Sequence, residues 1–183
     1  MRIAPAGLTP APAFELGSEL AAITHGHPTG WLAAGYLAQL VQEVVAGATL
    51  DEGALRALET LRRQPRHEET AAAVEKALWL SRAPRATTAD VVQLGAGFVA
   101  EEALAIGLYA AMVATTFEAC IELAANHDGD SDSTASIAGQ LWGARHGLDP
   151  MLAEVVNRLD VLEPLFDIFH EWSACPWSAR LTP

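Results

Sequence analysis

The chain has 183 residues and a formal net charge of −12, from 11 Lys and Arg against 23 Asp and Glu. Nucleic-acid and anionic membrane surfaces need clustered Lys and Arg to contact phosphates, so this balance argues against both as partners. With 51% hydrophobic residues the chain is too apolar for a disordered acidic segment, and it is long enough to bury a core.

Composition and length also indicate the fold class. Alanine, the strongest helix former, makes up roughly one residue in five, which predicts an all-α protein. The length predicts a single domain over residues 1–183. No signal peptide begins the chain, and the longest apolar stretch, residues 103–114, is too short to cross a bilayer. These features predict a cytoplasmic protein. Two cysteines, Cys120 and Cys175, are too few for a disulfide framework, and Cys120 lies in an apolar run typical of a buried side chain.

Helical periodicity organises the first half of the chain. Residues 1–12 hold three prolines and a glycine, which predicts an extended start. Apolar residues then recur at helical spacing and predict helices over residues 12–23, 28–46 and 68–80, and after the capping-box sequence Thr49-x-x-Glu52. We expect Gly26 to end the first helix as a left-handed cap and Pro28 to open the second. A polar link is expected over residues 81–90.

The second half begins at two glycines. Gly95 and Gly97 predict a tight turn that leads into a long apolar helix over residues 98–125. Three further elements are expected after it: a polar loop at residues 126–134, a helix that ends between Arg145 and Gly147, and a last helix at residues 149–171.

Several polar groups near these turns admit two interpretations. Glu101 and Glu102 lie in the first turn of the long helix, where carboxylates interact favourably with the helix dipole. A glycosidase acid–base pair would have to approach a bond from opposite sides, so the dipole interpretation is favoured. The glycine turn could cradle a phosphate at the N-terminus of this helix. His25 and His27 form an H-x-H pair that could bind a transition metal or could simply be exposed beside a helix end.

An acidic loop carries the strongest chemical signal. Asp128, Asp130 and Asp132 lie at i, i+2 and i+4, and like charges this close require compensation. One answer is the N-terminus of the following helix, whose free N–H groups a carboxylate can cap. The other is a hard divalent cation, which takes carboxylate and hydroxyl oxygens such as those of Asp-x-Asp-Ser. The residues alone leave both answers open.

The helix after this loop has an unusually small face. Ala135, Gly139 and Gly143 lie at i, i+4 and i+8. Small residues let helices approach closely, so we expect this helix to be central and to hold the acidic loop rigidly.

Four blocks of the sequence resemble one family. Residues 126–139, with the run Gly-Asp-Ser-Asp-Ser, resemble the C-terminal metal motif of the ADP-ribosylglycohydrolases, Gly-Asp-Ser/Thr-Asp-Ser/Thr before a small-residue helix. Residues 94–104, a glycine turn that opens a long helix, resemble a second block. The dipeptide at residues 24–25 and the segment at residues 1–5 resemble two more. The blocks occur in the family's order and cover nearly the whole chain.

The resemblance implies an all-α fold, two Mg²⁺ ions (Mn²⁺ in some members), and cleavage of the glycosidic bond between ADP-ribose and a side chain or small acceptor. By position in the motif, Asp130 and Asp132 would be carboxylate ligands of the metal. Ser133 stands where the family often has threonine and would supply a hydroxyl ligand. The two cations would position the ribose hydroxyls and stabilise charge at the scissile bond.

The same resemblance assigns a substrate side. His25 would approach the diphosphate or ribose, and Gly97 and Phe98 would line the ligand cleft. ADP-ribose or an ADP-ribosylated substrate is the implied partner.

The chain also departs from the family pattern. It contains neither the early acidic motif nor the Thr-Asp-Asp block that completes the metal site in the family. We therefore expect that the chain corresponds to the C-terminal half, that its cation site is weak or holds one ion, and that hydrolysis needs the missing half. The residues that carry catalysis are not identified by these motifs. A homo-oligomer or a complementing N-terminal chain is the expected partner. The alternative function is a non-catalytic α-helical scaffold, a pseudoenzyme or a gene fragment, that binds ADP-ribose or oligomerises.

Overall fold

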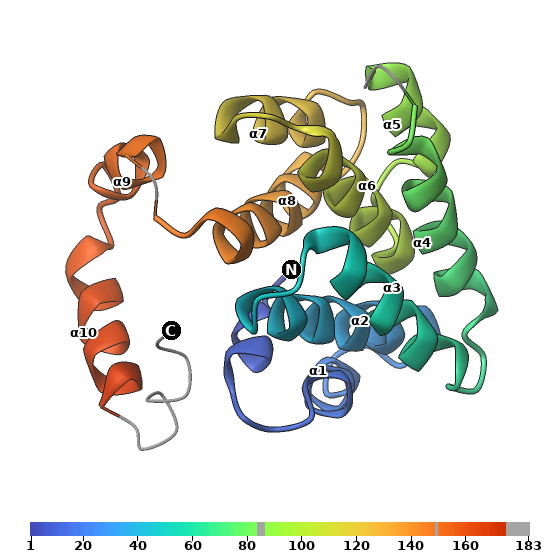
Figure 1. Ribbon diagram of the computed structural model, residues 1–183, viewed down its shortest axis with the longest axis horizontal. Helices are drawn as coiled ribbons and strands as arrows, with labels where there is room; N and C mark the ends of the chain where they lie inside the picture. Colours follow the sequence, from blue (N-terminus) through green and yellow to red (C-terminus); the bar gives the residue numbers. More distant parts are fainter. Residues whose placement is uncertain (84–86, 149, 175–183) are drawn as a thin grey trace.

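The computed structural model describes residues 1–83, 87–148 and 150–174, and Figure 1 shows how their helices are arranged. No strand occurs among these residues, which confirms the all-α expectation. The short 3-10 helix η1 spans Ala4–Leu8, within the segment expected to be extended. The α-helices are α1 Ala13–Ala22, α2 Pro28–Val45, α3 Leu50–Arg62, α4 Glu68–Leu80, α5 Thr88–Leu94, α6 Ala100–Val113, α7 Phe117–Ala125, α8 Ser131–His146, α9 Pro150–Val156 and α10 Leu162–Ser173.

Helix α2 is a hub of the fold. It packs against η1, α1, α3 and α6, and Pro28 occupies its first turn as expected. Its crossing with α1 is close because both helices carry glycine there. A Cβ on Gly17 would lie 2.7 Å from Ala38 Cβ, and one on Gly35 would lie 2.7 Å from the carbonyl oxygen of Phe14. The close crossing fixes the chain between α1 and α2.

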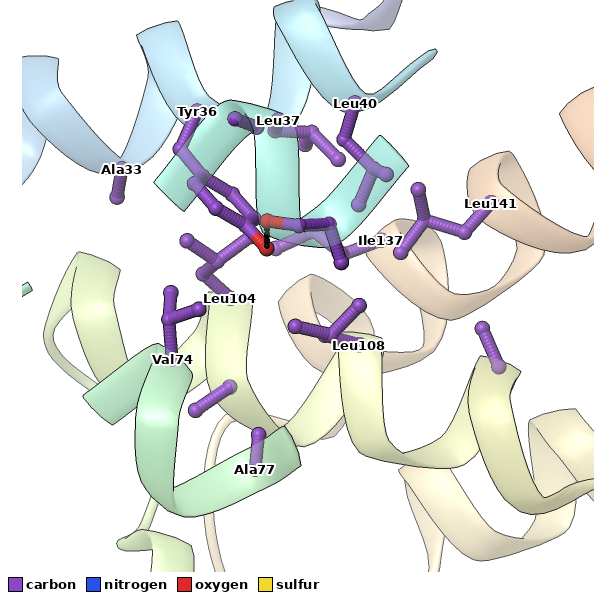
Figure 2. Close-up of a cluster of buried hydrophobic side chains, with 14 of the residues drawn as sticks. Ala33, Tyr36, Leu37, Leu40, Val74, Ala77, Leu104, Leu108, Ile137 and Leu141 are labelled. Atoms are coloured by element: carbon purple, nitrogen blue, oxygen red, sulfur yellow. Dashed lines mark hydrogen bonds between the residues drawn. The ribbon is translucent and has the colours of Figure 1, made fainter. Parts of the chain in front are cut away.

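Four helices supply the central core. Figure 2 shows side chains of α2, α4, α6 and α8 converging, among them Tyr36, Leu37, Val74, Leu104, Leu108 and Leu141. Burial of a large apolar side chain contributes about 1.5–3 kcal/mol, so this cluster dominates the stability of the fold. The hydroxyl of Tyr36 donates to the carbonyl oxygen of Ala54 at 3.1 Å, which satisfies its polar group inside the core.

Helix α8 is central, as expected, but its small face is not the reason. It packs against α6, α7 and α2. The close approach occurs at Gly107 of α6, where a Cβ would lie 2.5 Å from Cγ2 of Ile137. A Cβ on Gly139 would meet only Ile121 at an ordinary 3.4 Å, and one on Gly143 would have nothing within 4 Å. The predicted small-residue stripe therefore lies largely beside the tight contact.

Two of the expected helices form as two helices each. The segment at residues 98–125 is divided between α6 and α7 because Thr116 starts a new helix, and its hydroxyl accepts the N–H of Ala119 at 3.2 Å. The last segment is divided between α9 and α10. Pro164 lies in the first turn of α10, the part of a helix that tolerates a residue without an N–H, whereas inside a continuous helix it would remove a backbone hydrogen bond.

Two turn expectations also need correction. Gly26 is not among the described glycines with positive φ, so it is not a left-handed cap, whereas Gly47 and Gly147 do adopt positive φ after their helices. The expected polar link at residues 81–90 contains the start of α5, which opens with a second capping box formed by Thr87 and Asp90. The capping box of Thr49 and Glu52 forms as expected.

Cys120 is fully buried, as expected, and burial raises the pKa of its thiol to about 12. Cys175 lies outside the described residues. Among the described helices, none combines the length and apolarity that a membrane crossing requires.

Helices α9 and α10 lie apart from the rest of the molecule in Figure 1. Helix α10 exposes Leu165, Phe166, Ile168 and Phe169, each between 46% and 66% accessible.

Candidate functional site

A cavity of about 750 Å³ opens where four distant segments meet. The first is the N-terminal segment, residues 1–3, and the second is the α1–α2 corner, residues 23–30. The third runs from the glycine turn into the start of α6, residues 97–100. The fourth is the start of α8. Of the six residues that the sequence singled out, five line this cavity: His25, Gly97, Phe98, Asp130 and Ser133. Asp132 is exposed and does not line it, although it lies next to Asp130 and Ser133 in the chain.

The cavity has an apolar floor and a charged rim. Leu37 of α2, Leu104 of α6 and Ile137 of α8 form part of the floor, and Figure 2 shows them converging from three helices. Arg2 and Asp130 lie on the rim, together with the two histidines of the corner. An apolar pocket with a few convergent polar groups is typical of a small-molecule site.

The α1–α2 corner presents His25 on a short hydrogen-bond chain. Arg2 donates to Thr24 Oγ1 at 2.8 Å, and Thr24 Oγ1 lies 2.8 Å from His25 Nδ1. A Cβ on Gly30 would lie 2.8 Å from His25 Cβ, so the histidine rests directly on the start of α2. Because Nδ1 is engaged by the threonine, Nε2 is the ring nitrogen left for a ligand.

His27 lies beside His25 at the exposed corner. Its Nδ1 lies 2.9 Å from the hydroxyl of Thr29. Within residues 1–83, 87–148 and 150–174, no three His, Cys, Asp or Glu side chains gather as a metal-binding group. The exposure of both histidines agrees with their position beside a helix end, and metal binding by the pair stays a prediction.

The glycine turn is closed by Glu102. Gly95 and Gly97 have φ of +119° and +79°, which L side chains rarely adopt. The N–H groups of Ala96 and Gly97 donate to Glu102 Oε2 at 3.0 and 3.1 Å. These two amides are thus already engaged, so the turn does not offer them to a phosphate. Phe98 follows at the cavity mouth with 73% of its surface exposed.

The side chain of His127 holds the acidic loop in place through hydrogen bonds. Its Nδ1 accepts the N–H of Gly129 at 3.1 Å, so its Nε2 carries the proton and lies 3.0 Å from both Thr134 Oγ1 and the carbonyl oxygen of Ala124. Thr134 is fully buried and its hydroxyl also donates to Ala124 O. Nothing in the sequence spacing indicated this bracing role, which depends on the tertiary fold of the loop.

Asp130 stands at the N-cap position of α8 but makes no capping hydrogen bond with its side chain. The N–H of Ser133 donates instead to Asp132 Oδ1 at 2.9 Å. Its side-chain interaction with Asp132, followed by hydrogen bonding from the Ser133 hydroxyl, lowers the pKa of Asp130 from its usual value. The Asp130 carboxylate is therefore ionised at neutral pH, and its side chain does not cap the N-terminus of α8.

The family model of ADP-ribosylglycohydrolase matches residues 1–176. The chain belongs to the ADP-ribosylglycohydrolase family. No curated protein and no solved structure matches the chain. Family membership supports an ADP-ribosylglycohydrolase-like function, with an ADP-ribosylated substrate as the ligand, at the level of the family.

The oxygen donors of this ADP-ribosylglycohydrolase chain are of the chemical type that a hard cation prefers. Asp130 and Asp132 offer carboxylates and Ser133 offers a hydroxyl, the donor types that Mg²⁺ and Mn²⁺ prefer. They are few, because Mg²⁺ takes about six oxygen ligands. Alone, the chain's donors would fill only part of such a coordination shell.

Proposed function

We propose that the cavity binds ADP-ribose or an ADP-ribosylated substrate, with one weakly held Mg²⁺ or Mn²⁺ at its Asp130 end. Hydrolysis of the ADP-ribosyl glycosidic linkage is the proposed reaction, and it depends on metal ligands beyond those of this chain. One observation carries the proposal: the fold brings His25, the glycine turn and Asp130 to one cavity, although they lie far apart in the sequence.

The polarity of the cavity suits this ligand. His25 lies in the α1–α2 corner and Arg2 is hydrogen-bonded to that corner through Thr24, so a diphosphate would find a cation and an N–H donor there. Asp130 occupies the opposite segment, where a cation or ribose hydroxyls would find an ionised carboxylate. A volume of about 750 Å³ lies within the range of roughly 300–1,000 Å³ that is usual for small-molecule sites.

The chain's residues would divide the work as follows. Asp130, Asp132 and Ser133 would hold the cation, which when bound supplies positive charge at the scissile bond. Phe98 would cover the cavity mouth and exclude water from the bound ligand. His25 would donate from Nε2 to an oxygen of the diphosphate or ribose.

Calorimetric titration tests this function. Mg²⁺ and Mn²⁺ are titrated into metal-free protein with and without ADP-ribose. We expect weak cation binding that tightens when ADP-ribose is present. Asp130→Asn should weaken it by about tenfold or more, because it removes an ionised ligand.

Asp128→Asn is the matched control. Asp128 belongs to the same acidic loop but lies outside the Asp130–Ser133 segment to which the cation is assigned, and it is exposed, so its variant should bind within about twofold of the unchanged chain. Because Asp130 makes no capping bond, both variants should unfold within about 0.5 kcal/mol of the parent. Equal losses in both variants, or no heat from either ligand, would contradict the proposal.

A non-catalytic binder is the second candidate, and the short donor set favours it. An assay for release of ADP-ribose from an ADP-ribosylated peptide separates the two. Binding without release supports the binder, and release supports the hydrolase. Self-association, a complementing chain and a cytoplasmic location stay predictions.

A further inference from the structure

Glu102 makes contacts that a helix-dipole role does not require. It is the third residue of α6, and its Oε2 accepts both N–H groups at the middle of the glycine turn, those of Ala96 and Gly97. Its side chain also fills the space beside Gly95, where a Cβ would lie 2.3 Å from the Glu102 carboxyl carbon. The turn and this side chain are therefore built around each other.

The other side of the same turn holds the acidic loop. The carbonyl oxygen of Ala96 accepts the backbone N–H of Asp130 at 2.8 Å. The two backbones approach so closely that a Cβ on Gly129 would lie 1.8 Å from that oxygen. A Cβ on Gly97 would likewise lie 2.8 Å from Thr134 Cγ2. These contacts couple the backbone of Asp130 to the position of the glycine turn.

We propose that Glu102 is a positioning residue of the site: it fixes the glycine turn, and the turn fixes the backbone of Asp130. Hydrogen bonds to an ionised carboxylate are stronger than neutral ones, and here two converge on one oxygen. Helix α6 is largely buried, so the backbone that carries this carboxylate is held in the core. The effect on ligand binding rests on the proposed function, whereas the effect on the backbone does not.

Glu101 provides a matched control. It lies beside Glu102 in the first turn of α6, so it makes the same kind of dipole interaction, but no hydrogen bond joins it to the turn in the described structure. Variants Glu102→Ala, Glu102→Gln and Glu101→Gln are compared by amide NMR and hydrogen exchange, without any ligand. We expect exchange at the Asp130 amide to rise about tenfold or more in Glu102→Ala, with shifted resonances for Ala96 and Gly97.

The two glutamine variants show how the change at the Asp130 amide depends on which glutamate is altered and how severely. Glu102→Gln keeps a neutral acceptor of similar shape, so its changes should be smaller and in the same direction, and it keeps the test available if Glu102→Ala does not fold. Glu101→Gln should leave the Asp130 amide within about twofold of the parent. Affinity for ADP-ribose with Mg²⁺ should fall by about tenfold in Glu102→Ala and less in Glu102→Gln.

The outcomes separate the two claims. Equal effects of Glu101→Gln and Glu102→Gln would assign Glu102 to the helix dipole and overturn the proposal. An unchanged Asp130 amide in both Glu102 variants would overturn it as well. If the parent chain bound no ADP-ribose, the proposed function would fail, while faster exchange at Asp130 in the Glu102 variants would still support the positioning role.

Discussion

At the scale of single residues, the two tyrosines show how burial changes chemistry in this fold. Tyr36 donates to a backbone carbonyl in the core, and burial raises its pKa far above the usual value. The hydroxyl of Tyr109 donates to Asp90 Oδ2 at 2.9 Å and accepts the N–H of Thr87 at 3.3 Å. Burial, followed by the hydrogen bond to Asp90, raises the pKa of Tyr109 to about 12.

These shifts predict alkaline instability. An unfolded tyrosine loses its proton near pH 10, whereas folded Tyr109 keeps it until about 12. Between these values the unfolded chain binds fewer protons, so stability falls as pH rises through this window. The chain contains two tyrosines. Ultraviolet titration of the native protein should therefore show no phenolate at pH 10, and a tyrosine that ionises there in the native state would contradict the model of two protected hydroxyls.

At this scale the sequence named residues through motifs. His25, Gly97, Phe98, Asp130 and Ser133 were chosen by position in family blocks, and the fold gathers them at one cavity. Their proposed roles stay predictions. The roles of Glu102 and His127 were missed because each depends on backbone groups that only the folded turn and loop bring within reach.

At the scale of elements, boundaries with a local signal were predicted better than helix lengths. The capping box at Thr49 forms, and Pro28 opens α2. The breaks before α7 and α10 were missed because apolar periodicity continues across them. Thr116 and Pro164 carry the signal, one as a cap and the other as a residue without an N–H.

The tight contact of α6 with α8 yields a prediction at this scale. Gly107→Ala should destabilise the protein by about 1–3 kcal/mol, because its Cβ must displace Ile137. Gly143→Ala should instead stabilise it by about 0.4–1 kcal/mol, since nothing lies within 4 Å and alanine favours the helix. Urea unfolding measures both. If both variants lost a similar amount of unfolding free energy, the small-residue face of α8 would be a tight contact surface after all, contrary to this prediction.

At the scale of the whole molecule, the fold brings segments that are far apart in the sequence together around one cavity. The α1–α2 corner is fixed by glycine contacts between those helices, the glycine turn by Glu102, and the acidic loop by His127 and Ala96. Helices α9 and α10 lie apart from this assembly in Figure 1, and none of their described side chains lines the cavity. The length and composition predicted a helical protein, but not that its last described helices stand aside.

The most direct test of the binding site is chemical-shift mapping of ADP-ribose on ¹⁵N-labelled protein, with and without Mg²⁺. The amides of residues 24–30, 95–99 and 130–133 should shift together on one binding curve, and those of α9 and α10 should not move. Shifts concentrated outside these three segments, or none at millimolar ADP-ribose, would contradict the assignment of this cavity as the ligand site.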